Sequence, residues 1–68
     1  MKNSIKVERA KRDLTQAELA EKVNVTRQTI NSIETGKFVP STLLALKIAA
    51  VFQTTVDQVF TLQEKDWL

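Results

Sequence analysis

The stretch from residue 14 to residue 34 constrains the fold most, because it predicts two short helices joined by a tight turn. Thr15 and Glu18 stand in the T-x-x-E relation of a capping box, which begins the first helix. Asn24 interrupts the helical pattern, and asparagine tolerates the left-handed backbone that ends a helix. Thr26 then caps the second helix. Capping chemistry alone therefore predicts where both helices begin.

Apolar residues recur at helical spacing on both sides of this break. Such spacing places side chains on one face of a helix, where a core can cover them. The residues in question are Ala17, Leu19, Ala20 and Val23 before the break and Ile30 and Ile33 after it. The other face of the second helix is polar, and we expect it to meet the partner of the protein.

Length and composition indicate one small domain and argue against an enzyme. The chain has 68 residues, a single domain over 1–68, with neither cysteine nor histidine. Disulfides, thiolate or imidazole metal ligands and most nucleophile–base pairs therefore lack their usual members. We expect no catalytic residue, no metal site and no cofactor, and no pocket for a small-molecule ligand is evident. The net charge of +2 is compatible with a polyanionic partner or with ordinary surface charge.

No segment predicts a membrane span or a secretion signal. Lys6, Glu8 and Arg9 break the first apolar run. The longest apolar stretch, residues 43–52, contains Lys47 and is too short to cross a bilayer. We therefore expect no membrane partner and a cytoplasmic protein.

Two short helices are expected at the ends of the domain. Residues 5–12 form the first, with Asn3 or Ser4 as its cap. Thr55 and Gln58 form another capping box, which begins a short fifth helix.

A fourth helix, residues 42–52, is expected to be the central element of the core. Gly36 and Pro40 place a loop before it, and Ser41 caps it. Its apolar residues mark two flanks, so we expect burial on more than one side, with apolar surface left for a partner chain. One flank has Leu43, Leu46 and Ala50, and the other has Leu44, Ile48, Val51 and Phe52.

The segments LTQAELAEKVNVTRQTINSIETGKFVPS and LLALKIAAVFQTTVDQVF closely resemble the Cro and phage-repressor type of helix-turn-helix regulator, also called the xenobiotic-response-element family. The resemblance covers residues 5–60. It implies an all-α, five-helix, lambda-repressor-like DNA-binding domain whose helix-turn-helix spans 15–34. In some relatives the flanking residues, here 1–3 and 61–64, pair as a small two-stranded sheet.

The short single-domain form is similar to small homodimeric repressors of bacteria and archaea. The resemblance therefore implies a homodimer, double-stranded DNA with a palindromic operator as the partner, and a nucleoid-associated place in the cytoplasm. The chain departs from the family pattern at two positions. Asn24 stands where glycine is usual. Glu8 stands where an apolar residue is usual, so either the first helix is rotated or displaced, or Glu8 reaches solvent or a basic partner.

The start of the third helix is expected to read base edges. Arg27 can pair with guanine and Gln28 with adenine, and Asn31 and Ser32 lie one turn further on. The resemblance supports Arg27, Gln28 and Ser32 as groove-facing. A bland alternative is a solvated helix face.

A second set of residues is expected to bind DNA phosphates. Gln16 lies in the first turn of a helix, where amides favour a phosphate, and the matching glutamine of the family contacts the backbone. Thr26, Thr29, Thr35 and Lys37 are expected on the other side. For Gln16, Thr26 and Thr35, simple helix capping is an alternative that is compatible with phosphate binding.

Two further predictions concern assembly. The resemblance implies an ion pair between Arg9 and Glu34 that fixes the angle of the recognition helix. The tail, residues 61–68, is expected to be docked rather than frayed, because its apolar end is unfavourable in water. The predicted dimer interface consists of Phe60, Leu62, Trp67 and Leu68. The rival to a DNA-binding regulator is a protein-interaction module, such as an antitoxin or an adaptor.

Overall fold

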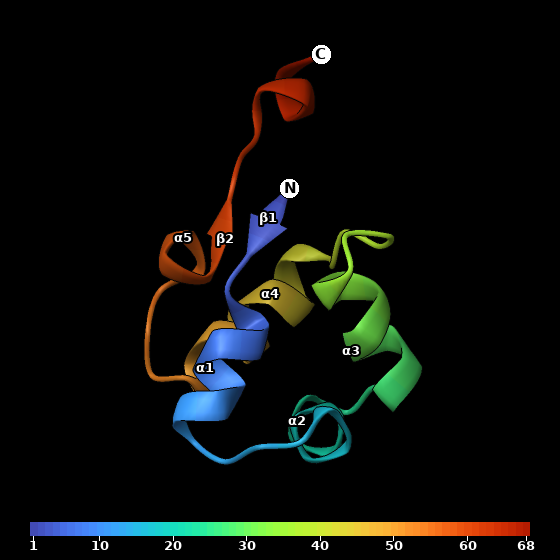
Figure 1. Cartoon of the computed structure of the whole chain (residues 1–68), viewed down its shortest axis with the longest axis vertical. Coiled ribbons are helices and arrows are strands. Elements are labelled where there is room, and N and C mark those ends of the chain that lie inside the picture. The colour runs from blue at the N-terminus through green and yellow to red at the C-terminus, as the bar shows by residue number, and fades with distance from the viewer.

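The structure is a computed structural model that describes all 68 residues. Five helices and a two-stranded sheet form the fold (Figure 1). The elements in chain order are β1 (Lys2–Asn3), α1 (Ile5–Lys11), α2 (Gln16–Val23), α3 (Arg27–Glu34), α4 (Thr42–Val51), α5 (Val56–Val59), β2 (Phe60–Thr61) and the 3-10 turn η1 (Glu64–Trp67). The predicted five-helix fold with a small sheet from the two ends is confirmed. No helix is long and apolar enough to cross a membrane.

The helix-turn-helix segment is built from the predicted caps. The Thr15 hydroxyl accepts from the Glu18 amide at 3.0 Å, and the Glu18 carboxylate accepts from the Thr15 amide at 2.9 Å. The hydrogen bond from the Thr15 amide is the main cause of the lowered pKa of Glu18, and the hydrogen bond with the Thr15 side chain is the second cause. Asn24 adopts the left-handed conformation, with φ 61°. Thr26 accepts from the Thr29 amide at 3.1 Å, so α3 begins where expected.

The core lies between α1, α2, α3 and α4 and is closed by α5. Its fully buried large side chains are Ile5, Leu19, Ile30, Ile33, Ile48, Phe52 and Val59. Ala17 was expected on the inner face of α2, but it is exposed. The buried residues of α2 are Leu19, Ala20 and Val23. At 3.6 residues per turn, Ala17 lies about 200° around the helix from Leu19, so it points away from that residue.

The expectation that α4 is buried on more than one side is wrong. Leu44 and Ile48 are covered, whereas Leu43 and Leu46 keep 64% and 54% of their surface in water. Only one flank of α4 faces the other helices, because the domain has no element that covers the second flank. An exposed apolar flank therefore remains.

The first helix accommodates Glu8 on its surface. The Glu8 carboxylate accepts from Arg12 at 2.9 Å and from Lys11 at 3.2 Å, and the hydrogen bond from Arg12 is the main cause of its lowered pKa. Asn3 caps the helix, because its side-chain oxygen accepts from the Ile5 amide at 3.2 Å. Lys11 and Arg12 thus neutralise the Glu8 carboxylate, and α1 still packs on the core.

The predicted capping box at the start of α5 is not formed. Thr55 makes no side-chain cap hydrogen bond. The Gln58 amide bonds instead to the Thr55 carbonyl at 3.1 Å. This is the tighter bonding of a 3-10 turn, so the amide has a backbone partner although the Thr55 hydroxyl does not accept from it.

The sheet leads into a tail that stands away from the helices (Figure 1). β1 and β2 are antiparallel, with Lys2 opposite Thr61 and Asn3 opposite Phe60, one residue earlier than predicted at the second strand. Trp67 is 75% exposed, so the expectation of a docked tail is wrong for the isolated chain. Asp66 bonds to the Met1 ammonium, which holds the tail beside the sheet rather than on the helices.

Candidate nucleic-acid interface

The polar face of α3 lies on the outside of the molecule. Ile30 and Ile33 bury the opposite face, with 0% and 2% of their surface exposed. Arg27, Gln28 and Asn31 are exposed. An eight-residue helix with one apolar stripe therefore presents the predicted base-reading side chains to solvent, at the edge of the fold (Figure 1).

Gln28 and Ser32 border a polar hollow beside α3. The hollow has a volume of about 350 Å³ and is lined by Thr26, Gln28, Thr29, Ser32, Lys37 and Phe38. Two predicted base readers thus share one surface with three predicted phosphate contacts. The Thr26 and Thr29 hydroxyls lie 3.0 Å apart, and Thr26 also accepts from the Thr29 amide. One hydroxyl proton of the pair remains available for an incoming acceptor.

Arg27 lies on the other side of α3, against the start of α2. One guanidinium nitrogen, Nη1, donates to the Gln16 side-chain oxygen at 3.1 Å. Both residues line a second hollow, together with Arg9, Asp13, Leu14, Thr15 and Ala17. The structure therefore separates Arg27 from Gln28, although the sequence places them next to each other.

Gln16 connects α2 to three residues. Its amide nitrogen donates to Asn31 Oδ1 at 3.1 Å and to Glu34 Oε1 at 3.3 Å. Its oxygen accepts from Arg27. Sequence reasoning did not predict this role. The available signal was the position of Gln16 in a first turn that the spacing brings beside α3.

Arg9 and Glu34 form a two-bond ion pair. Arg9 Nε and Nη2 donate to the two Glu34 carboxylate oxygens at 2.7 and 3.0 Å, and the side chains are 14% and 8% exposed. The hydrogen bond with Glu34 is the main cause of a raised Arg9 pKa. Arg9 also donates to the Leu14 carbonyl at 2.9 Å. The pair ties the end of α3 to α1 and to the start of the helix-turn-helix.

Thr35 caps the end of α3. Its hydroxyl donates to the Asn31 carbonyl at 2.9 Å, with a weaker approach to the Ser32 carbonyl at 3.3 Å. A hydroxyl has a single proton, so Thr35 has none left for a phosphate in this arrangement. Lys37, in the following loop, is exposed. Of these two phosphate candidates, the geometry favours Lys37.

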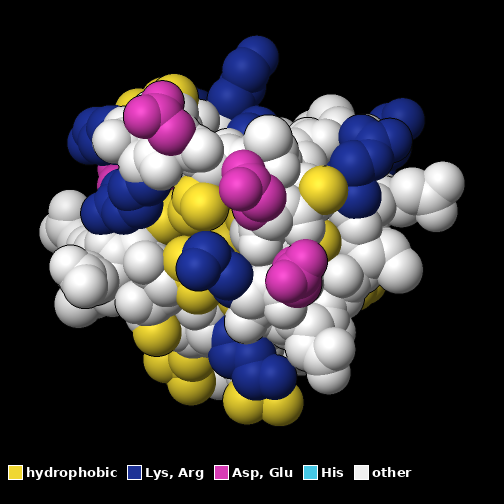
Figure 2. All heavy atoms as spheres, turned by 90° about the horizontal axis from the view of Figure 1, so that it is seen from below, with side chains coloured by type: hydrophobic (Ala, Val, Ile, Leu, Met, Phe, Trp, Pro, Cys, Tyr) yellow, Lys and Arg dark blue, Asp and Glu magenta, His cyan; other side chains and the backbone are white.

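Charge alone does not mark the candidate interface. Figure 2 shows basic and acidic side chains interspersed on the lower end of the molecule, with no uniform basic patch. The polar geometry around α3, rather than net charge, distinguishes this region.

The four residues predicted for the dimer interface differ in exposure. Leu62, Trp67 and Leu68 are exposed, whereas Phe60 is 7% exposed and belongs to the core.

Comparison with known proteins identifies the family. A helix-turn-helix family model matches residues 5–59. The uncharacterized HTH-type transcriptional regulator YgzD of Bacillus subtilis is 48% identical over 66 residues, which is 97% of this chain and 100% of the relative. The uncharacterized HTH-type transcriptional regulator MJ0272 of Methanocaldococcus jannaschii is 46% identical with the same coverage. The relatives thus come from both bacteria and archaea. The chain belongs to the helix-turn-helix transcriptional regulators of Cro/C1 type, a DNA-binding family without enzymatic activity.

Proposed function

We propose that the protein is a homodimeric repressor that reads a palindromic operator by placing α3 in the major groove. The observation that carries this proposal is the division of α3 into a buried stripe, Ile30 and Ile33, and an outward polar face bordered by donors on both sides. A helix in the major groove reads bases with side chains of this face.

The reading chemistry follows from the free donors. Arg27 gives one of its five guanidinium N–H groups to Gln16, so four remain, and two of these can pair with guanine O6 and N7. Gln28 is exposed and has no hydrogen-bond partner that would compete with adenine. Ser32 lies one turn beyond Gln28 in the same hollow. Asn31 is already bonded to Gln16, so it supports the readers in the free protein.

The phosphate contacts flank the readers. The first amides of α2 have no partner within the helix, and with Gln16 they favour an anion on one side. Lys37 and the Thr26–Thr29 hydroxyl pair provide donors on the other side. The Gln16 amide has two protons, both used within the protein, so binding a phosphate requires release of the exposed Asn31.

Two-fold symmetry supplies the rest of the contact. One eight-residue helix touches few base pairs, whereas two helices read half-sites about 34 Å apart. The exposed Leu62, Trp67 and Leu68 offer apolar surface for a second protomer. A dimer bound over a promoter blocks access to it.

Selection of bound sites from random DNA tests this function. We expect an enriched palindrome with two half-sites one helical turn apart. We also expect the logarithm of the binding constant to fall steeply and linearly with the logarithm of salt concentration. A failure to enrich any sequence, with equal binding to all DNA, would overturn the sequence-specific part of the proposal.

The second candidate is a protein-interaction module, an antitoxin or an adaptor. The exposed apolar tail and the net charge of only +2 favour it. Salt dependence separates the two functions, because an apolar protein contact does not weaken steeply as salt rises. An enriched palindrome together with a steep salt slope would exclude this module as the main function.

A further inference from the structure

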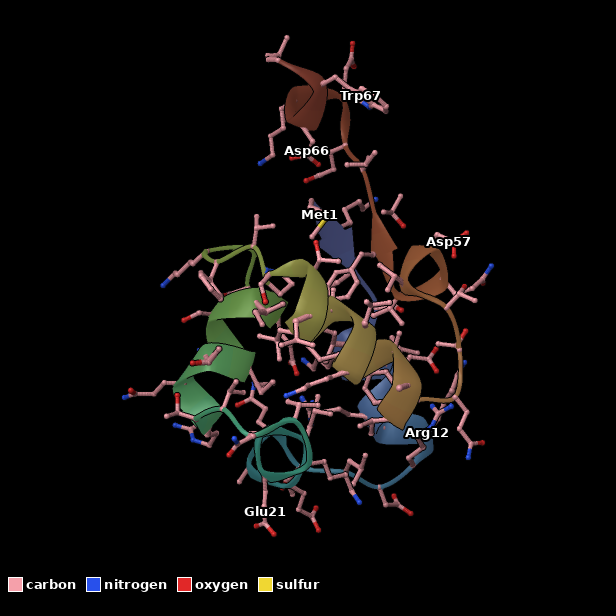
Figure 3. The ribbon with its side chains drawn as sticks, turned by 180° about the vertical axis from the view of Figure 1, so that it is seen from behind. Met1, Arg12, Glu21, Asp57, Asp66 and Trp67 are labelled. Carbon is pink, nitrogen blue, oxygen red and sulfur yellow. The ribbon has the colours of Figure 1, made fainter.

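The C-terminal arm, residues 62–68, projects from the helical body. Extended chain leads from β2 into η1, which ends at Trp67. Trp67 and the following Leu68 have 75% and 106% of their surface exposed. Figure 3 shows Trp67 at the far end of the arm, clear of the helices. The longest dimension of the molecule is 34 Å, against 22 and 20 Å for the others. The arm thus carries a large apolar side chain away from its own core.

Polar contacts at its base hold the arm in this direction. The Asp66 carboxylate accepts from the Met1 ammonium at 3.2 Å and from the Gln63 amide at 2.7 Å. Gln63 and Asp66 also form the capping box of η1. Trp67 follows directly on Asp66, so these contacts favour the direction in which the arm carries it.

An apolar groove opens beside the base of the arm. It has a volume of about 360 Å³ and lies between the start of α4, α5 and the sheet. Its walls include Met1, Val39, Pro40, Leu46, Val56 and Phe60. Val39 is 63% exposed and Leu46 is 54% exposed, so water fills the groove in the isolated chain. The hollows beside α3 and beside the Thr35–Gly36 turn are lined mainly by polar residues.

We propose that the C-terminal arm of one protomer occupies the apolar groove of a second copy of this chain, and that the second arm occupies the first groove in return. Trp67 is the side chain that enters. The inference rests on the homodimer of the proposed function and names the contact that forms it. Both unpartnered apolar surfaces lie on one chain, and a two-fold axis covers both at once because its interface is self-complementary.

The area is sufficient for a specific contact. A tryptophan buries about 150–250 Å² when it is covered. Leu68 and the 58% exposed Leu62 extend the apolar surface along the arm. Two arms and two grooves together bring the buried area to the order of 1,000 Å², where specific interfaces begin. Met1 lies in the groove wall and also anchors Asp66, so each protomer presents its arm from the edge of its own groove.

Tryptophan fluorescence tests the arm exchange, because Trp67 is the only tryptophan of the chain. Emission and sedimentation equilibrium are measured over the same series of protein concentrations. We expect the emission of a water-exposed tryptophan in dilute protein and a shift to shorter wavelength as dimers form, with one midpoint for both measurements. Short-wavelength emission at concentrations where sedimentation shows a monomer would mean that the arm occupies its own groove, which overturns the proposal.

Variants on both sides of the contact identify it. Trp67→Ala in the arm and Leu46→Gln in the groove should each raise the dimer dissociation constant at least about tenfold, as hot-spot residues do. The double variant should lose no more than the larger single loss, because both changes remove one contact. Val7→Ser, at an exposed apolar residue of α1, is the matched control and should leave dimerisation unchanged.

Two outcomes separate this inference from the proposed function. Specific DNA binding by a dimer whose Trp67 emission does not change would overturn the arm exchange and leave the DNA-binding function standing. Concentration-dependent emission that follows dimerisation, without any preference among DNA sequences, would support the arm exchange and overturn the sequence-specific function. A monomer at every concentration, with or without DNA, would overturn the arm exchange and the homodimer together.

Discussion

At the residue scale, the free protein already holds Arg27 in one orientation. Gln16 accepts from Arg27 and donates to Asn31 and Glu34, and Glu34 in turn binds Arg9. A side chain that is ordered before binding loses less conformational entropy when it contacts DNA. Four polar side chains from three helices thus prepare one of the proposed readers, while Gln28 keeps its rotational freedom.

Substitution of the readers should change base preference. Arg27→Ala and Gln28→Ala should each cost about 1–3 kcal/mol on the preferred operator, with a smaller loss on random DNA, because each removes a base-edge pair. Lys37→Ala is the matched control and should weaken binding to both DNAs alike, because a phosphate contact reads no sequence. Titration of each variant with operator and random duplexes measures this. Equal losses on both duplexes for all three variants would contradict the assignment of readers.

Removal of one member of the Arg9–Glu34 pair should destabilise the fold. Glu34→Ala leaves a guanidinium that is only 14% exposed without its acceptor, and the loss of one partner of such a pair costs about 3–5 kcal/mol at full burial. We therefore expect a loss at or below the lower end of this range. Urea unfolding measures it, with Arg9→Met/Glu34→Met as the comparison. A double variant that loses more than Glu34→Ala would show that the pair itself, rather than the uncompensated charge, carries the stability.

At the element scale, helix ends position the site more than helix interiors do. α2 ends at Asn24 in the left-handed region, with φ 61°, and Asp13 and Gln53 take similar values at other helix ends. A residue in the left-handed conformation ends the helix and changes the direction of the chain sharply. The turn at Asn24 therefore sets the angle between α2 and α3, and the Thr26 cap fixes where the first reader appears.

Substitution of Asn24 should reveal the strain at this turn. Asn24→Ala should destabilise the protein by about 1 kcal/mol, because a Cβ without a local hydrogen bond is unfavourable at positive φ. Asn24→Gly should be close to neutral, since glycine adopts this conformation freely but is more flexible when unfolded. Chemical denaturation measures both changes. Similar losses for Ala and Gly would mean that the asparagine side chain, rather than backbone strain, matters here.

Protonation of three hydrogen-bonded carboxylates should make the protein less stable in acid. Hydrogen bonds lower the pKa of Glu8, Glu18 and Asp66, so the folded state binds fewer protons than the unfolded state as pH falls. Their contribution is present above the ordinary carboxyl pKa of about 4 and is lost as pH falls through the lowered values. The melting temperature should therefore decline below about pH 4. Glu18→Gln keeps a capping box but should reduce this decline, and an unchanged pH profile would contradict the role of Glu18.

At the scale of the whole molecule, the surface offers a polar and an apolar region. The outward face of α3 is polar, while the exposed flank of α4, the apolar groove and the C-terminal arm present apolar surface. Figure 1 shows α3 and the arm in different parts of the fold. In the proposed homodimer, this separation would let a second protomer bind without covering the proposed base-reading side chains. The geometry of that dimer would then fix the distance between the two α3 helices.

Half-site spacing should therefore be strict. Insertion of about half a helical turn of DNA between the half-sites should reduce the affinity toward that of a single half-site, because it rotates one site to the far side of the duplex. Insertion of a full turn should also weaken binding, since a rigid dimer cannot stretch. Gel-shift titration of the spacer series measures this. Equal affinity for all spacers would contradict a rigid homodimer.

The sequence by itself determined the local structure around the site. Thr15, Glu18 and Thr26 specified two helix starts, and Asn24 specified the end between them, because capping depends on residues within one turn. The same spacing identified the outward positions of α3. The capping pattern failed for Thr55, whose hydroxyl makes no cap hydrogen bond while the Gln58 amide bonds to the Thr55 carbonyl.

Tertiary packing decided what the pattern left open. An apolar helix can be covered on either flank, and only the placement of its neighbours left Leu46 in water. The direction of Trp67 depends on a contact between Met1 and Asp66, 65 positions apart, which no local pattern encodes. The separation of Arg27 from Gln28 likewise depends on where α2 brings Gln16. Local chemistry thus defined α3, and long-range contacts decided how its side chains are held and which apolar surfaces remain exposed.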